Sequence, residues 1–259
     1  MVLITGASSG IGAALARVFA GHGHAVVLAA RRKSRLKALA DEIAAAGHKR
    51  PVTIAVDLAA RNGVARLARE LAARRLEPAI VVNNAAFGLY GQANDLDHAQ
   101  QLMMIDLNAR TLTDLSLRWV ASLARHKGGI LNVASVTGFV PGPGMATYSA
   151  CKAYVISLSE ALHGELKPSG IKVSALCPGP VLTEFQARAG IRSNHFPRFM
   201  MRSAERVARE GYDGLMAGKR IIVPGFHNKA AIVLARILPH SIMRRLSEIS
   251  INKPARRGG

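Results

Sequence analysis

Short runs of apolar and β-branched residues alternate along the chain with longer stretches in which apolar residues recur at helical spacing. Glycine and proline separate many of these stretches, so the pattern predicts alternating strands and helices. The predicted strands are Val2–Thr5, Ala25–Ala29, Pro51–Val56, Ala79–Asn83, Gly129–Ala134, Lys172–Leu176 and Arg220–Val223. The predicted helices are Ile11–Gly21, Arg35–Ala46, Gly63–Ala73, His98–Arg125, Tyr148–Leu166 and Ala204–Met216.

Alternation of this kind is typical of a parallel sheet with helices on both faces. Right-handed crossovers then give an α/β, doubly wound Rossmann fold, here with a seven-stranded parallel sheet. The chain has no linker rich in Pro, Gly or Ser and no internal repeat, which favours a single domain over residues 1–259. Ligands in such folds bind beyond the carboxyl ends of the strands, so the residues that follow each strand are the candidate site.

Composition narrows the class of protein. Hydrophobic residues make up 49% of the chain, enough for a sizeable core. Cys151 and Cys177 lie far apart without metal-ligand spacing, so we expect reduced thiols and no metal site. No basic stretch precedes the first apolar run, and no run approaches the roughly 20 residues of a membrane-spanning helix. These features predict a cytoplasmic protein.

The chain carries 35 Lys and Arg against 16 Asp and Glu, a formal net charge of +19. A nucleic acid, an anionic lipid or an acidic ligand could each exploit this charge. The basic residues are spread along the chain without a nucleic-acid-binding motif, so we expect a diffuse solvated surface and no specific nucleic-acid partner.

A glycine-rich turn joins the first predicted strand to the first helix. Gly6 permits a tight turn, Gly10 lets the backbone approach a pyrophosphate, and Gly12 lets the helix pack closely on the strand. The helix N-terminus adds free N–H groups and a positive dipole end. This context favours a dinucleotide site over an ordinary turn, and the binding residues would be Gly6, Ser8, Ser9, Gly10, Ile11 and Gly12.

The end of the second predicted strand indicates which dinucleotide binds. Folds that prefer NAD usually place an acid there for the ribose 2′-hydroxyl, but this chain has Ala30-Arg31-Arg32. A guanidinium binds a 2′-phosphate through two donors, so NADP(H) is the expected cofactor. Arg31 is the first choice for that contact and Arg32 the second. The alternative is that both are ordinary surface arginines.

Two further strand ends carry candidate cofactor contacts. Asp57 follows the third strand, where its carboxylate either accepts a hydrogen bond from an adenine amino group or caps a helix. Asn84 follows the fourth strand, and its side chain can tie neighbouring backbone together. The small residues Ala85 and Ala86 permit close approach of a ligand.

Tyr148 and Lys152 stand at i and i+4 at a helix start, so they share one helical face. An ammonium ~4 Å from the phenol, at an effective dielectric near 20, favours the phenolate by about 4 kcal/mol, roughly three pK units before desolvation is counted. Tyr148 would then titrate near working pH, as general acid–base catalysis requires. Ser135, after the fifth strand, can bind a substrate oxygen as charge develops there.

The order of these motifs resembles that of the short-chain dehydrogenase/reductase family. The likeness runs from Val2 to about Pro224, and its motifs are Thr5–Gly12, Asp57-Leu58, Asn83–Ala86, Asn108, Ser135, Tyr148–Lys152 and Pro178-Gly179. The chain departs from the family at Ala86, where a glycine is usual. The added methyl group puts the local geometry of that loop in doubt.

The resemblance implies a role for each motif. Tyr148 looks like the catalytic acid–base, and Lys152 is similar to the lysine that lowers its pKa and holds the nicotinamide ribose. Ser135 would orient the carbonyl, and Asn108 would hold a proton-relay water. The further cofactor contacts that it implies are Leu58, Pro178, Gly179, Val181 and Thr183.

The function so implied is an NADP(H)-dependent oxidoreductase that interconverts a ketone or aldehyde and its alcohol. The alternative is a cofactor-binding regulatory or membrane-surface protein of the same fold, which would not need the complete set of reactive residues.

Substrate choice is expected to depend on residues 184–202, which match a mobile lid in the family. The candidate pocket residues are Ser135, Phe139, Met145, Phe185 and Phe199. The four apolar members of this set favour a hydrophobic carbonyl compound, with 3-oxoacyl compounds among the candidates. Arginines in the same segment leave a substrate with an acidic tail open.

The C-terminal extension, residues 226–259, is basic and less similar to the family. One interpretation is a weak contact with an anionic membrane surface. The other is a helix that closes the substrate pocket or contacts another subunit. The resemblance also implies a homo-oligomer, a dimer or tetramer, built through the helices that match His98–Arg125 and Tyr148–Leu166.

Overall fold

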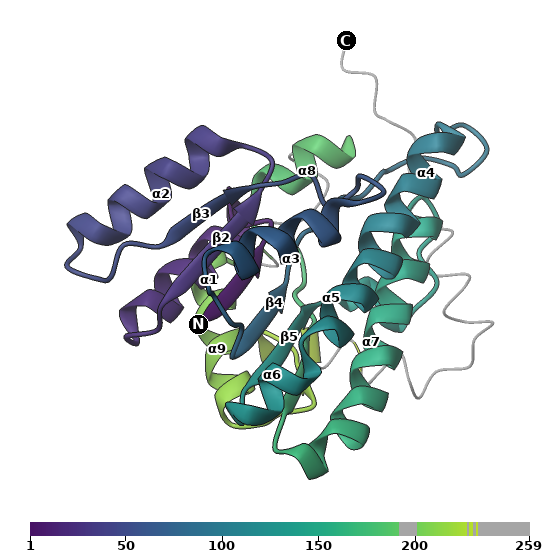
Figure 1. Cartoon of the computed structure of the whole chain (residues 1–259). Helices are drawn as coiled ribbons and strands as arrows, with labels where there is room; N and C mark the ends of the chain where they lie inside the picture. Colours follow the sequence, from purple (N-terminus) through teal and green to yellow (C-terminus); the bar gives the residue numbers. More distant parts are fainter. Residues whose placement is uncertain (192–200, 227, 230–231, 233–259) are drawn as a thin grey trace.

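The computed structural model describes residues 1–191, 201–226, 228–229 and 232, in which a parallel sheet lies between two layers of helices (Figure 1). Seven strands lie in the order β3-β2-β1-β4-β5-β6-β7, all parallel, which confirms the predicted doubly wound fold. The strands are β1 Val2–Thr5, β2 Val26–Ala30, β3 Val52–Ala55, β4 Ile80–Asn83, β5 Gly129–Val133, β6 Lys172–Leu176 and β7 Ile221–Ile222.

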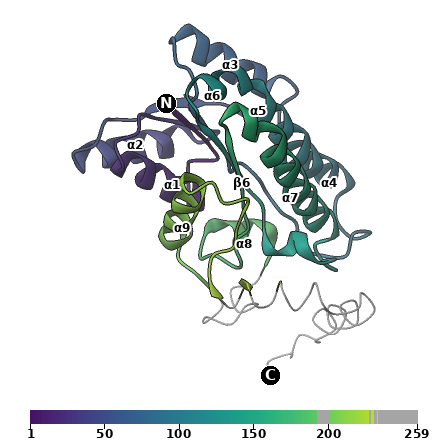
Figure 2. The ribbon, with the colours of Figure 1, turned by 90° about the horizontal axis from the view of Figure 1, so that it is seen from below.

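Helices cover both faces of this sheet. They are α1 Gly10–Gly21, α2 Lys33–Ala45, α3 Gly63–Ala73, α4 His98–Ile105, α5 Leu112–Arg118, α6 Val120–Arg125, α7 Ala146–Leu166, α8 Glu184–Ala189 and α9 Ala204–Met216. Successive strand side chains face opposite sides, so one strand contributes to two cores. Val2 and Ile4 of β1 pack with α1, α2 and α9, whereas Leu3 packs with α3 and α5. Figure 2 shows these two layers on opposite sides of the sheet.

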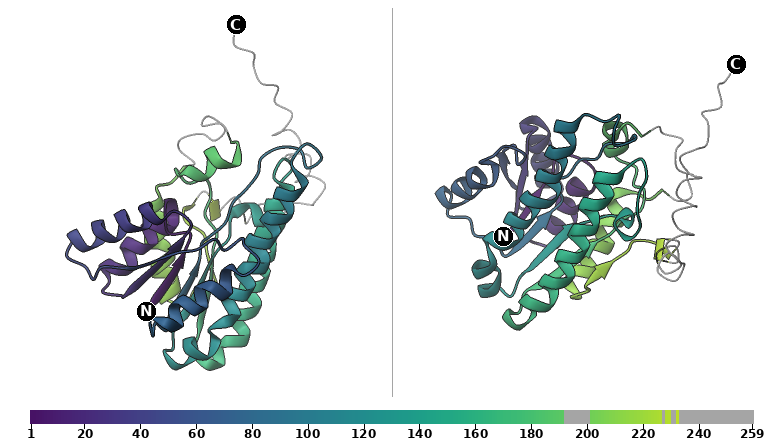
Figure 3. Two further views of the ribbon diagram at one scale, coloured as in Figure 1. Left: turned by 45° about the horizontal axis from the view of Figure 1, so that its top comes forward. Right: turned by 90° about the vertical axis from the view of Figure 1, so that its right-hand side faces the viewer.

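The strand order reverses between β1 and β4. The chain runs from β1 through β2 to β3 and then returns to β4 on the other side of β1. The crossovers therefore leave β1 and β4 in opposite directions, and a crevice opens at their carboxyl ends. The glycine-rich turn after β1 and the segment Asn83–Ala86 after β4 both begin at this point, and α8 lies above it (Figures 1 and 3).

The region predicted as one helix, His98–Arg125, is interrupted in the structure. After α4, a π-helical turn spans Asp106–Thr111, and Trp119, with φ −115°, separates α5 from α6. A π-helical turn inserts one residue into a helix and is frequent at functional sites. A one-residue shift barely alters the apolar periodicity, which explains why the sequence pattern resembles a continuous helix.

Several predictions fall on residues outside the described ranges. These include Phe199, residues 192–200 of the predicted lid and most of the basic extension with its expected membrane contact. Within the described ranges, no helix combines the length and apolar character needed to cross a membrane.

Candidate active site

The turn between β1 and α1 closes tightly on its own backbone. Gly6 and Gly10 have φ angles of +65° and +56°, in the left-handed region that favours glycine. A Cβ atom on Gly6 would lie 2.8 Å from the Ala85 Cα, and one on Gly12 would lie 2.6 Å from the Gly6 carbonyl oxygen. Side chains at these two positions would therefore collide with backbone.

Asn84 fastens this turn to the end of β4. Its Nδ2 donates to the carbonyl oxygens of Thr5, at 2.9 Å, and Gly6, at 3.2 Å. In return, the Thr5 hydroxyl accepts hydrogen bonds from the backbone N–H groups of Asn84 and Ala85. Ala86 lies outside the left-handed region, so its methyl group is compatible with the backbone of this loop.

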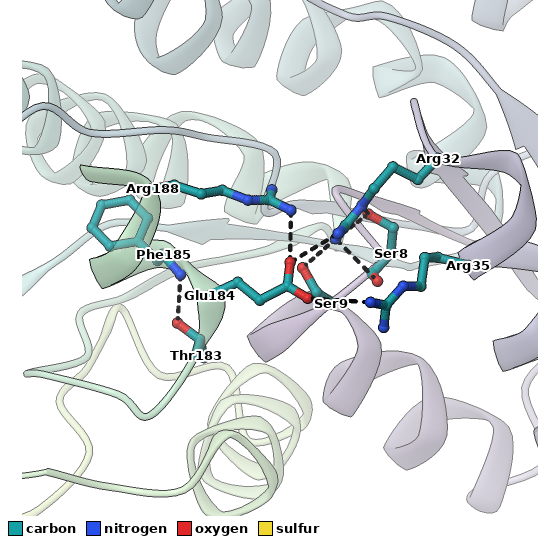
Figure 4. Close-up of polar contacts among 8 residues, drawn as sticks. All are labelled: Ser8, Ser9, Arg32, Arg35, Thr183, Glu184, Phe185 and Arg188. Carbon is teal, nitrogen blue, oxygen red and sulfur yellow. Dashed lines mark hydrogen bonds and ion pairs between the residues drawn. The ribbon is translucent and has the colours of Figure 1, made fainter. Parts of the chain in front are cut away.

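Arg32 lies directly against the turn (Figure 4). The Arg32 Nη2 donates to the hydroxyls of Ser9, at 2.8 Å, and Ser8, at 3.1 Å. Its Nη1 pairs with Glu184 at 2.8 Å. Arg31 is exposed beside the same cleft and forms no ion pair with any residue that the structure describes. Arg32, the second choice for the 2′-phosphate, is therefore the arginine that contacts the turn, and the first choice of Arg31 for the 2′-phosphate stays a prediction.

Asp57 does not cap the helix that follows it, because α3 begins at Gly63 and its N-cap residue is Asn62. The Asp57 Oδ1 accepts a hydrogen bond from the Ala59 N–H at 3.0 Å, so the carboxylate stabilises the turn after β3. Asp57 and Leu58 also line the cleft, which leaves them accessible to a ligand.

Tyr148 and Lys152 lie on one face of α7, as their spacing predicts. The Lys152 Nζ lies 5.5 Å from the centroid of the Tyr148 ring and donates to the Val133 carbonyl oxygen at 2.7 Å. Ser135 lies close enough to Tyr148 to lower the pKa of the phenol, and its hydroxyl accepts the Thr137 N–H at 3.2 Å. The end of β5 thereby holds both the lysine and the serine beside the phenol.

Burial shifts the pKa values of both Tyr148 and Lys152. It raises the pKa of Tyr148, and Ser135 opposes this only in part. Burial also lowers the pKa of Lys152 to about 8. The expectation that Lys152 brings the Tyr148 pKa toward neutrality is therefore wrong for the chain alone, because desolvation of the phenolate dominates. Tyr148 is a neutral phenol near pH 7, with a proton to donate.

Asn108 lies in the π-helical turn and is 1% exposed. Its Nδ2 donates to the Phe87 carbonyl oxygen at 2.8 Å, and its Oδ1 accepts the Phe87 N–H at 3.2 Å. Both ends of the amide thus hold the backbone that follows Ala86, and the side chain stays behind the cleft wall.

The segment from Pro178 to Thr183 faces the phosphate turn. A Cβ on Gly10 would lie 3.0 Å from the Thr183 Cγ2, so the two segments are neighbours. Val181 pairs with Arg202 in an isolated bridge. The Thr183 hydroxyl accepts the Phe185 N–H at 3.3 Å and so caps α8.

Apolar side chains surround the phenol. The Phe185 and Tyr148 rings lie 5.4 Å apart, and a Cβ on Gly88 would lie 2.7 Å from the Phe185 Cζ. Phe139 and Met145 line the same cleft.

One cleft of about 590 Å³ brings these groups together. Every predicted site residue in the described part of the chain lines it, except Gly12 and Asn108, which support its wall from behind. Lining residues beyond those predicted from the sequence include Gly88, Thr137 and Asn228. No motif marks them, because they reach the cleft through tertiary structure.

A buried polar network under the cleft was also missed. The Asn83 Nδ2 donates to the Asn132 Oδ1 at 2.8 Å and to the Ser116 hydroxyl at 3.0 Å. The Asn132 Nδ2 donates in turn to Ser159, at 3.0 Å. The network connects β4, α5 and β5 to α7, and so fixes the helix that carries Tyr148.

Comparison with known proteins identifies the family, since residues 1–193 match the short chain dehydrogenase family. The chain is a short-chain dehydrogenase/reductase. It is 37% identical to sulfoacetaldehyde reductase 2 of Chromohalobacter salexigens over 190 residues. This alignment covers 71% of this chain and 74% of that protein.

Solved structures of this family have the same fold. A short-chain dehydrogenase from Sphingobium yanoikuyae in complex with NADPH superimposes with a TM-score of 0.80 and 32% identity, covering 100% of this chain and 97% of that one. The bulky-bulky ketone specific alcohol dehydrogenase from Comamonas testosteroni gives a TM-score of 0.76 at 30% identity, over 93% and 95% of the two chains. The chain is thus an oxidoreductase of alcohol and carbonyl groups, and the family relationship supports a nicotinamide cofactor.

Replacement of Lys152 by Met is expected to stabilise the protein near neutral pH. The folded pKa of about 8 lies below the ordinary value of 10.5, so the buried ammonium destabilises the fold below pH 8. That cost disappears as pH rises from about 8 to 10.5. After allowance for the lost hydrogen bond to Val133, we expect K152M to raise the Tm at pH 7 by about 2–4 °C.

Thermal unfolding at pH 7 and pH 9.5 measures this effect, and the gain should shrink at the higher pH. Lys172→Met is the matched control, because Lys172 also donates to a backbone carbonyl but at an exposed position. A lower Tm for K152M at pH 7, or a gain that does not change with pH, would contradict the assignment of a buried, destabilising ammonium.

Proposed function

We propose that the chain is an NADPH-dependent oxidoreductase that interconverts a ketone or aldehyde and its alcohol. The observation that carries this proposal is the position of Tyr148, Ser135 and Lys152 in one cleft with the phosphate turn. The cleft fits a dinucleotide, because the backbone at Gly6 leaves no room for a side chain and the arginines after β2 make that end of the cleft cationic.

The side chains divide the reaction between them. The bound nicotinamide supplies the hydride for the carbonyl carbon. The Ser135 hydroxyl orients the carbonyl oxygen, and Tyr148 donates its proton to that oxygen as negative charge develops. Lys152 holds the nicotinamide ribose and stabilises the tyrosinate that remains. A phenol whose pKa lies at or above its ordinary value is neutral near pH 7, so Tyr148 holds the proton that reduction requires.

Asn108 serves this reaction as a positioning residue. The amide donates one hydrogen bond to the Phe87 backbone and accepts another from it, so we expect a proton-relay water to bind to the Asn108 backbone instead. The π-helical turn supports this arrangement, since such turns release backbone groups from regular helical pairing.

The preference for NADPH rests on charge after β2. Ala30 leaves no carboxylate for a ribose 2′-hydroxyl. Arg31, which has no ion pair with the described residues, offers its guanidinium to a 2′-phosphate, with Arg32 beside it. The relative solved with NADPH is consistent with this choice.

A hydrophobic carbonyl compound fits the cleft best. Phe139, Met145, Phe185 and Ile191 provide an apolar wall near Tyr148. The Arg188 guanidinium is already paired with Glu184, at 2.6 Å, which favours this choice over a substrate with an acidic tail.

An exposed apolar face supports the proposed homo-oligomer. The exposed side chains on α4, α5 and α7, each 43–50% exposed, are Leu102, Met103, Ile105, Leu117 and Tyr154. A second copy of the chain would remove this surface from water.

Tyr148→Phe tests the proposed chemistry. The variant keeps the ring but lacks the proton donor, so NADPH binding should persist while reduction of a carbonyl substrate falls by about 10²–10⁴-fold. Tyr154→Phe removes the same hydroxyl six residues further along α7 and should retain activity. Turnover that survives in Y148F would refute the role of Tyr148.

Arg31→Ala tests the cofactor preference. Loss of one guanidinium contact to a 2′-phosphate should weaken NADPH binding by about tenfold and leave NADH binding nearly unchanged. Arg66→Ala, at an exposed position on α3, controls for the change in net charge. Tighter binding of NADH than NADPH by the wild-type chain would overturn the preference.

Ile105→Asp combined with Leu117→Asp tests the subunit face. Two carboxylates there would be costly to bury, so the mass in solution should fall from dimer or tetramer to a smaller species. Light scattering after size-exclusion chromatography measures the mass, and Met216→Asp on α9 is the control. A monomeric wild-type chain contradicts the proposal.

A further inference from the structure

Glu184 places a carboxylate in the basic end of the cleft. Its Oε2 lies 2.8 Å from the Arg32 Nη1 and 2.6 Å from the Arg188 Nη2, and its Oε1 lies 3.9 Å from the Arg35 Nη2 (Figure 4). The hydrogen bond from Arg32 is the main reason that the pKa of Glu184 lies below its usual range. The carboxylate is therefore ionised at neutral pH and sits among three cations.

The same arginine connects two distant segments. On one side, the Arg32 guanidinium donates to Ser8 and Ser9 of the phosphate turn. On the other side, it holds Glu184, the first residue of α8. The bridge therefore ties the start of the predicted lid to the turn that would bind cofactor phosphates.

If a phosphate bound to Arg32, Ser8 and Ser9, the Arg32 guanidinium would contact both that phosphate and the Glu184 carboxylate. Two anions held within a few ångströms repel each other, even where water screens them in part. A 2′-phosphate carries close to two negative charges near neutral pH, so the repulsion would be larger for NADP(H) than for NAD(H).

We propose that Glu184 is a specificity-determining residue whose carboxylate holds Arg32 until a cofactor 2′-phosphate replaces it, which releases α8 from the phosphate turn. The inference rests on the proposed preference for NADP(H). A cofactor without the 2′-phosphate leaves the bridge in place, so release of α8 is coupled to the phosphorylated cofactor alone.

Calorimetric titration with 2′,5′-ADP and with 5′-AMP tests the proposal without turnover. Glu184→Gln keeps the shape of the side chain and removes its charge. It should tighten binding of 2′,5′-ADP by about tenfold and change binding of 5′-AMP by less than about twofold. Glu70→Gln, which breaks an exposed ion pair with Arg74 on α3, should alter neither value.

Hydrogen exchange gives an independent readout. Addition of 2′,5′-ADP should accelerate exchange of the α8 amides in the wild-type chain, whereas 5′-AMP should not. In E184Q these amides should exchange rapidly from the start.

The outcomes separate this inference from the cofactor preference. Equal binding of the two nucleotides by the wild-type chain would refute the preference for NADP(H). An E184Q variant with an unchanged ratio of the two affinities, or with weaker 2′,5′-ADP binding, would refute the role of Glu184. Unchanged α8 exchange on addition of 2′,5′-ADP would refute the release.

Discussion

The crossover helices leave a crevice at the carboxyl ends of β1 and β4, because the chain leaves these neighbouring strands in opposite directions. The backbone at their carboxyl ends must therefore be held by other means. Asn84 does this from β4, through hydrogen bonds to the carbonyl oxygens of Thr5 and Gly6. The turn so held presents Ser8 and Ser9 to Arg32, and the cleft begins there.

The opposite end of the cleft depends on burial of charge. Lys152 is 2% exposed and Tyr148 is 8% exposed, so desolvation opposes the charged form of each. The hydrogen bond from the Lys152 ammonium to the Val133 carbonyl oxygen, at the end of β5, offsets part of this cost. Such burial is unfavourable for stability, and titratable groups with strongly shifted pKa values are common at functional sites.

Local features of the site could be predicted from sequence, and long-range features could not. The phosphate turn lies within eight residues, and Tyr148 and Lys152 lie one helical turn apart, so spacing alone describes them. Glu184 meets Arg32 across 152 residues, and no local pattern indicates that contact. The π-helical turn at Asn108 was not predicted from the sequence, because a one-residue shift leaves the apolar periodicity nearly unchanged.

The direction of the Tyr148 pKa shift could not be predicted from the sequence for a different reason. Spacing along a helix gives the distance to Lys152, and hence the attraction, but the cost of burial depends on everything packed around the phenol. Phe185, which follows the nicotinamide-binding segment predicted by the resemblance, contributes to that surrounding through ring contact at 5.4 Å.

The central claim is that this cleft reduces a carbonyl group at the expense of NADPH. Oxidation of NADPH by the wild-type chain, followed across ketones, aldehydes and 3-oxoacyl thioesters with identification of the product, tests it most directly. We expect at least one hydrophobic carbonyl compound to yield its alcohol, one molecule for each NADPH oxidised. Tight binding of NADPH without oxidation by any member of the panel would contradict it.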